Sequence, residues 1–142
     1  MRSRIYFFSE DLKFSPPAIR KTRVWLKQVA DAENKSLDEL TYIFCSDSYL
    51  LGINIEYLGH DMLTDIITFN TAENEAGISG DVFISVERVA ENAAKFKVSF
   101  AEELHRVMVH GLLHLLGYDD KSTQQKKIMR EKEFAYLSLR DF

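Results

Sequence analysis

The sequence is poor in the residues that build disulfide frameworks, flexible linkers and membrane spans. Its one cysteine, Cys45, excludes an internal disulfide network and any metal site made of several thiolates. Two prolines and six glycines are too few to form a linker. No apolar run approaches the roughly 18 residues of a membrane-spanning helix, and the run Ile5–Phe8 is too short for the core of a signal peptide. These absences favour a cytoplasmic protein without a membrane partner.

What is present fits an ordinary globular protein. The 142 residues are 46% hydrophobic and 28% charged, which excludes a disordered or fibrous chain. At this length one domain, covering residues 1–142, can bury a core without a disulfide or metal staple. The formal net charge of −4 argues against a protein that is coated in nucleic acid, but it does not exclude an enzyme that binds RNA locally and briefly.

Local patterns predict strands in the first two thirds of the chain and helices mostly after them. This order indicates an α+β fold in which several helices pack on a small mixed β-sheet. Ser99 and Glu102 have the spacing of a capping box, which marks the start of one helix. We predict strands over 5–8, 40–44, 64–69 and 81–86, a loop over 70–77, a helical or irregular segment over 46–58, and helices over 17–31, 86–95, 99–116 and 123–139.

The most informative segment runs from Leu104 to Asp120. Its apolar residues surround most of a helix, which is typical of a buried central helix. Two imidazoles, His110 and His114, nevertheless project from it four residues apart, and so side by side. Burying an unpartnered polar group costs on the order of 1–3 kcal/mol, so both rings need a hydrogen bond or a shared ligand.

A divalent metal ion would satisfy both rings at once. Neutral imidazole nitrogens one helical turn apart can converge on one ion. Gly111 leaves space beside the pair, and Gly117 can end the helix in a left-handed turn, after which Asp119 or Asp120 could supply a third ligand. Three protein ligands leave one coordination position open, as in catalytic zinc sites. The alternative is a pair of core histidines that hydrogen-bond to backbone groups or carboxylates.

The ligand spacing is shared with one class of zinc proteases, but the general base of that class is missing. In those enzymes a glutamate directly follows the first histidine and takes a proton from water. Here that position is Gly111. A metalloprotease is therefore the less favoured interpretation.

The segment His110-Gly-Leu-Leu-His-Leu-Leu-Gly-Tyr-Asp-Asp120 resembles the signature of the YbeY family, which reads His-Gly-x-Leu-His-Leu-x-Gly-Tyr-Asp-His. The family consists of bacterial metal-dependent endoribonucleases linked to ribosomal RNA maturation and ribosome quality control. The resemblance covers most of the chain after residue 40, in the family's order. Its further matches are residues 54–57, 64–69 and 80–85, together with Met129 and Glu133.

The resemblance implies a fold, an activity and a set of site residues. The central helix would hold one Zn²⁺ per chain in a zincin-like arrangement, with His110, His114 and Asp120 as ligands and Asp119 as a supporting carboxylate or a plain turn residue. The implied function is a zinc-dependent, single-strand-preferring endoribonuclease that matures the 3′ end of 16S ribosomal RNA and serves ribosome quality control. Its partners would be ribosomal RNA and ribosomal particles, and no DNA is expected.

Three positions depart from the family pattern. Asp120 replaces the third metal histidine, and a carboxylate there should weaken the Lewis acid and widen the choice of metal. Leu58 replaces an arginine that is expected to help catalysis or hold RNA phosphate, and Asn70 replaces a proline. These departures keep open a second function, that of a ribosome-assembly or RNA-binding factor with weak or no nuclease activity.

Candidate RNA contacts are Lys121, His60 and Arg88. Lys121 directly follows the third ligand, His60 lies two residues beyond Leu58, and Arg88 opens a predicted helix. Other basic groups near the proposed site stand on one face of the last predicted helix. Each of these residues can also be an ordinary solvated side chain.

Overall fold

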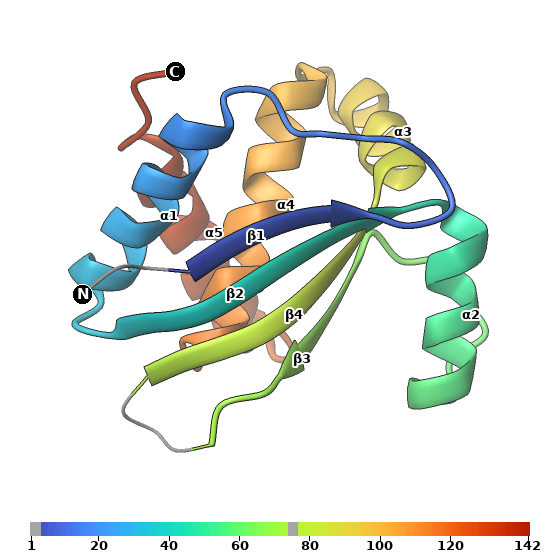
Figure 1. Ribbon diagram of the computed structural model, residues 1–142, viewed down its shortest axis with the longest axis horizontal. Helices are drawn as coiled ribbons and strands as arrows, with labels where there is room; N and C mark the ends of the chain where they lie inside the picture. The colour runs from blue at the N-terminus through green and yellow to red at the C-terminus, as the bar shows by residue number, and fades with distance from the viewer. Residues whose placement is uncertain (1–3, 74–76) are drawn as a thin grey trace.

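A computed structural model describes residues 4–73 and 77–142, which form a four-stranded sheet with helices on it. The predicted α+β class with a small mixed sheet is confirmed (Figure 1). The elements in chain order are β1 (Arg4–Ser9), α1 (Ile19–Ala32), β2 (Ser36–Cys45), α2 (Asp47–Leu58), β3 (Ile66–Asn70), β4 (Gly77–Ser85), α3 (Val86–Phe96), α4 (Phe100–Leu115) and α5 (Thr123–Leu137).

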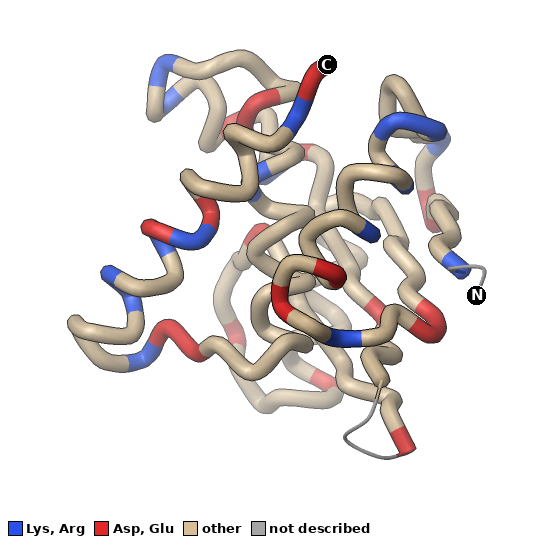
Figure 2. Tube along the Cα trace, turned by 90° about the vertical axis from the view of Figure 1, so that its left-hand side faces the viewer, with Lys and Arg blue, Asp and Glu red and all other residues tan. Residues whose placement is uncertain are grey.

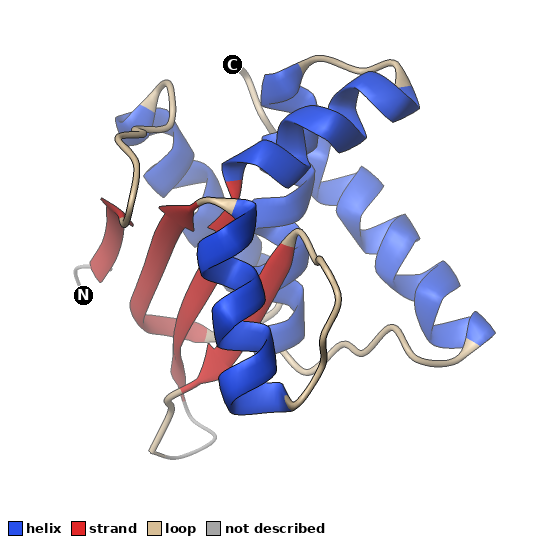
Figure 3. Ribbon diagram, turned by 90° about the vertical axis from the view of Figure 1, so that its right-hand side faces the viewer, coloured by secondary structure: helices blue, strands red, loops and turns tan. Residues whose placement is uncertain are grey.

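The sheet has the strand order β1-β2-β4-β3. β1 runs parallel to β2 and β2 runs parallel to β4, whereas β3 pairs with β4 in the antiparallel direction, for example Ile66 with Ile84. Side chains alternate between the two faces of each strand. Val82 and Ile84 of β4 therefore face the main core with α1 and α4, whereas Phe83 and Ile67 face the smaller cluster under α2. In Figure 3, α2 stands in front of the strands.

Helix α4 is the central helix of the main core. Its buried apolar residues surround most of its circumference, as the sequence pattern predicts. Gly111, which directly follows the first candidate ligand, packs on the sheet. A Cβ there would come within 2.8 Å of Val82 Cγ1 and 2.9 Å of Ile66 Cδ1. The expectation that Gly111 leaves space beside the histidines is wrong, because its missing side chain allows close contact between helix and sheet.

The element bounds differ from the predicted ones mainly at the strands. β2 begins at Ser36 rather than residue 40, β3 begins at Ile66 rather than residue 64, and β4 begins at Gly77 rather than residue 81. Residues 47–58 form a regular helix, with the Ser46 side chain accepting a hydrogen bond from the backbone of Tyr49 at its start. Part of the loop predicted over 70–77 lies outside the described residues.

Serine caps fix the starts of the two helices that carry the site. The Ser99 side chain accepts from the Glu102 backbone at the start of α4, at the predicted spacing. A complete capping box lies at α5, where Ser122 and Gln125 exchange hydrogen bonds. In the described part of the chain, none of the helices combines the length and the apolar composition that crossing a membrane requires.

Candidate metal centre

Helix α4 brings His110 and His114 together at the border of the core. Their side chains are 15% and 25% exposed, and their Nε2 atoms lie 3.1 Å apart. The Asp120 carboxylate completes the group, with Oδ2 3.4 Å from His110 Nε2 and Oδ1 3.6 Å from His114 Nε2. Three donor atoms from one helix and the segment after it thus face one another.

The spacing of these atoms suits a divalent metal ion. With metal–ligand bonds of roughly 2.0–2.1 Å, tetrahedral ligands lie about 3.3 Å from one another. The two imidazole nitrogens are 3.1 Å apart, and each of them has one oxygen of the Asp120 carboxylate within 3.6 Å. Burial and the neighbouring His110 ring lower the pKa of His114 from its ordinary value of 6.5, which keeps its lone pair available. The cluster of His110, His114 and Asp120 could therefore hold a metal ion.

A tight turn after α4 brings the aspartate back to the helix. Gly117 adopts a φ of 107°, which an L side chain rarely tolerates, and the Tyr118 backbone N–H donates to the Leu113 carbonyl at 3.0 Å. Of the two candidate aspartates, Asp120 reaches the imidazoles. Asp119 is exposed, and in the residues that the structure describes it makes no hydrogen bond or ion pair with either ring.

Glu133 of α5 orients the first imidazole. The His110 Nδ1–H donates to Glu133 Oε2 at 2.6 Å, which leaves Nε2 as the nitrogen with the free lone pair. Glu133 is among the family matches in the sequence, but no local pattern assigned it a role of its own. One signal could have found it. Met129, Glu133 and Tyr136 share the buried face of α5, and a glutamate on such a face requires a partner.

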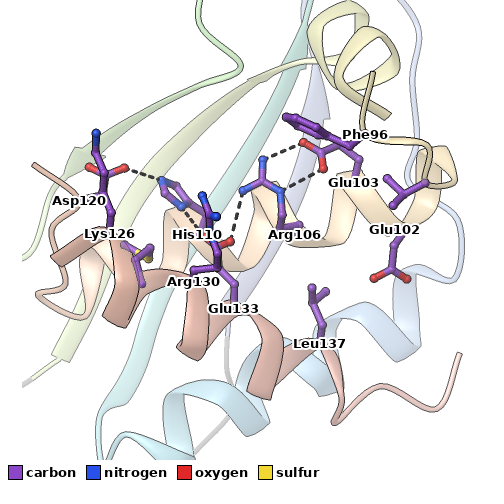
Figure 4. A pocket seen from close by; sticks show the side chains of 12 residues that line it. Phe96, Glu102, Glu103, Arg106, His110, Asp120, Lys126, Arg130, Glu133 and Leu137 are labelled. Atoms are coloured by element: carbon purple, nitrogen blue, oxygen red, sulfur yellow. Dashed lines mark hydrogen bonds and ion pairs between the residues drawn. The ribbon is translucent and has the colours of Figure 1, made fainter. Parts of the chain in front are cut away.

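Arg106 holds Glu133 from the other side. Its guanidinium donates to Glu133 Oε1 at 3.3 Å and makes two bonds to the buried Glu103 carboxylate, at 3.0 and 2.7 Å, as Figure 4 shows. The Asp65 carboxylate lies 3.7 Å away. The hydrogen bonds to Glu103 outweigh burial and raise the pKa of Arg106 further above its ordinary value, so a fixed positive charge lies one helical turn before His110.

Two clefts meet at the donor atoms. The first, of about 620 Å³, lies between α4 and α5 and is lined by His110, Asp120 and the basic residues Arg106, Lys126 and Arg130 (Figure 4). The second, of about 630 Å³, lies between the end of α2 and β3, and its lining includes His114 and Lys121. The first three charged residues of α5 are all basic, and acidic residues follow only at positions 131 and 133 (Figure 2). Lys126 and Arg130 both line the first cleft.

The three predicted RNA contacts lie in two separate places. Lys121 and His60 both line the second cleft with His114, and Leu58, the position of the missing arginine, lines it too and is 46% exposed. Arg88 lies elsewhere. Its guanidinium pairs with Asp47 at 2.8 Å and with Glu91 at 2.5 Å, and so ties α3 to α2.

Comparisons with known proteins identify the family of this chain. The family model described as Endoribonuclease YbeY matches residues 6–140. A relative named Endoribonuclease YbeY from Cytophaga hutchinsonii is 51% identical over 97% of this chain and 96% of its own length, and one from Flavobacterium johnsoniae is 52% identical over 93% and 94%. The solution structure of a Thermotoga maritima protein superposes with a TM-score of 0.66 at 27% identity, covering 94% of this chain and 87% of that one.

Proposed function

Because the chain belongs to the endoribonuclease YbeY family, we propose that it is a zinc-dependent endoribonuclease that cleaves single-stranded ribosomal RNA in the cytoplasm. The proposed reaction is the maturation of the 3′ end of 16S RNA, with a further part in ribosome quality control. The observation that carries the proposal is the cluster of three donor atoms where two clefts meet.

His110, His114 and Asp120 would hold the ion, one per chain. When bound, such an ion supplies a Lewis acid that polarises a phosphoryl oxygen and makes water more acidic. Glu133 keeps the His110 ring in the tautomer that offers Nε2. Asp119, one residue before the third ligand and exposed, is assigned to hydrogen-bond water beside the site.

The two clefts suggest a path for an RNA strand. The strand would enter along Lys126 and Arg130, pass the donor atoms, and leave along Lys121 and His60. Basic side chains on both sides would hold the backbone phosphates, which dominate binding and carry no sequence information. This arrangement positions one phosphodiester at the ligands without requiring a basic protein overall.

The packing of Gly111 argues against a peptidase. In the zinc proteases with this ligand spacing, the residue after the first histidine is a glutamate that acts on water. Here that position faces Val82 and Ile66 of the sheet, where even a Cβ is too close. The structure therefore has no room for that base at that place.

Metal-dependent RNA cleavage tests the proposal directly. Metal-replete protein is incubated with single-stranded RNA and, separately, with casein. We expect RNA cleavage that EDTA stops and added zinc restores, an intact casein, and no RNA cleavage by His114→Ala. RNA binding without cleavage, unchanged in His114→Ala, would instead favour an RNA-binding assembly factor. Casein cleavage would overturn the nuclease assignment.

A further inference from the structure

A partly buried carboxylate at the end of α1 accepts hydrogen bonds from three donors that lie far from it in the sequence. Glu33, which follows the last residue of α1 and whose side chain is 13% exposed, accepts hydrogen bonds from the Tyr118 hydroxyl at 2.6 Å, from Lys132 Nζ at 3.1 Å and from the Tyr136 hydroxyl. We call these four residues the Glu33 clamp. The Lys132 ammonium also lies 5.5 Å from the centre of the Tyr118 ring. None of these residues lines the two clefts at the donor atoms, in the described part of the chain.

The two oxygens of Glu33 serve different elements. Oε1 accepts from Tyr118, which lies in the segment between α4 and α5, two residues before Asp120. Oε2 accepts from Lys132 and Tyr136, both of which belong to α5. One oxygen therefore holds the segment that carries the third candidate ligand, and the other ties α1 to α5.

The segment 117–122 depends on a few anchors. At its start the Tyr118 backbone bonds to α4, and at its end the backbone N–H groups of Lys121 and Ser122 donate to Gln125 Oε1 at 3.1 and 3.0 Å. Between these anchors, the Asp120 side chain is 41% exposed. In the described residues, its carboxylate pairs only with the two imidazoles. Its position must therefore come from the backbone that carries it.

We infer that Glu33 is a positioning residue for the metal site, acting on Asp120 through the Tyr118 hydroxyl. Fixing Tyr118 removes freedom from the backbone two residues before the carboxylate. A ligand supplied by a loop binds well only when the loop is already held in the binding geometry. The inference rests on the proposed metal site, and it assigns that site a supporting residue at the end of α1, more than half the chain length away from the candidate ligands in the sequence.

The separate use of the two oxygens supplies a matched control. Tyr118→Phe and Tyr136→Phe each remove one hydroxyl that bonds to Glu33 and leave the ring in place. Both should lower thermal stability by a similar small amount. Zinc affinity of the metal-free protein, measured by competition with a chromophoric chelator, should fall about tenfold in Tyr118→Phe and less than twofold in Tyr136→Phe. Equal losses of affinity in both variants would overturn the inference.

Conservative replacement of the carboxylate gives a second measurement. Glu33→Gln keeps an oxygen that can accept from Tyr118, whereas Glu33→Ala keeps none. We expect zinc affinity to fall in Glu33→Ala by as much as in Tyr118→Phe and to recover in part in Glu33→Gln. A Glu33→Gln protein as weak as Glu33→Ala would count against the hydroxyl contact.

A double-mutant cycle identifies the residue through which the effect passes. In an Asp120→Asn background, Tyr118→Phe should cause no further loss of zinc affinity, because the ligand it positions is already impaired. The same tenfold loss in both backgrounds would show that Tyr118 acts through another route. Unchanged zinc binding in Tyr118→Phe overturns this inference alone, whereas wild-type protein that binds no zinc overturns the proposed function with it.

Discussion

Helix α4 carries histidines in two environments that differ sharply. His105, near its start, is 3% exposed, and its ring packs edge-on against Trp25 and Phe142. The Arg140 guanidinium donates to its Nδ1 at 2.6 Å. Burial, with the Arg140 charge adding to it against a smaller opposite effect of Glu102, lowers the pKa of His105 to about 4. This imidazole is a neutral part of the core.

His110 and His114, one and two turns further along, face carboxylates instead of a cation. Glu133 accepts a hydrogen bond from the His110 Nδ1–H, and Asp120 faces the Nε2 atoms of both rings. The comparison shows that position on a helix does not decide whether an imidazole is a neutral part of the core or a candidate metal ligand. The charged groups that neighbouring elements place beside the ring make the difference. His105 faces Arg140 near the C-terminus, whereas His110 and His114 face the carboxylates of Glu133 and Asp120.

The largest expected effect is the loss of the metal in His114→Ala. Removing one of two imidazoles that share an ion should reduce zinc to below stoichiometric levels while far-ultraviolet circular dichroism stays close to wild type. Elemental analysis of the purified protein measures the metal. His105→Gln, a change to the same helix at the buried site, is the control and should keep one zinc per chain. A His114→Ala protein with full zinc would contradict the ligand assignment.

A smaller loss is expected from Glu133→Gln. The glutamine keeps the size of the side chain, but it removes the charge that accepts the His110 Nδ1–H. Partners of this kind typically contribute 10- to 100-fold to metal affinity, so we expect a loss in that range by chelator competition. An affinity equal to wild type would mean that the tautomer of His110 is fixed by other means. Thermal unfolding of the metal-free variant reports any separate loss of stability.

A gain of affinity is expected from Asp120→His. A third imidazole is a softer and stronger zinc ligand than a carboxylate. The affinity for zinc should therefore rise several-fold, and the affinity for manganese relative to zinc should fall. Competition titrations with both metals measure the change. Unchanged affinity would indicate that Asp119 or water, and not Asp120, is the third ligand.

The smallest expected signal concerns the pH dependence that His105 adds to stability. Its pKa is lower in the folded chain than in the unfolded one, so as the pH falls the unfolded chain takes up the proton first. Between pH 6.5 and 5.5 the free energy of unfolding of the wild type should therefore fall by about 1 kcal/mol more than that of His105→Gln. Urea unfolding of the metal-free proteins at both pH values measures the difference. Parallel losses would show that His105 is not the titrating group.

Much of the fold follows from local patterns. The apolar circumference of α4 and the helical pattern of α1 lie within single elements, and the observed helices match them closely, whereas β4 begins four residues before its predicted start. The bounds of β2 and β3 differ by two to four residues from the prediction. Strand ends depend on which neighbour offers hydrogen bonds, and a neighbour comes from a distant part of the chain.

The candidate site also combines features that the local sequence determines with features that only the tertiary structure determines. Helix geometry alone places His110 beside His114, and a glycine at position 117 predicts the turn that returns the chain, because both features are set by backbone angles within a few residues. The residue pattern left Asp119 and Asp120 both open, and only the family resemblance implied Asp120, whose carboxylate faces the imidazoles in the structure. The support from Glu133 and the close packing of Gly111 came only with the tertiary structure. Each depends on the distance between elements that are far apart in the sequence, and packing of the whole core fixes that distance.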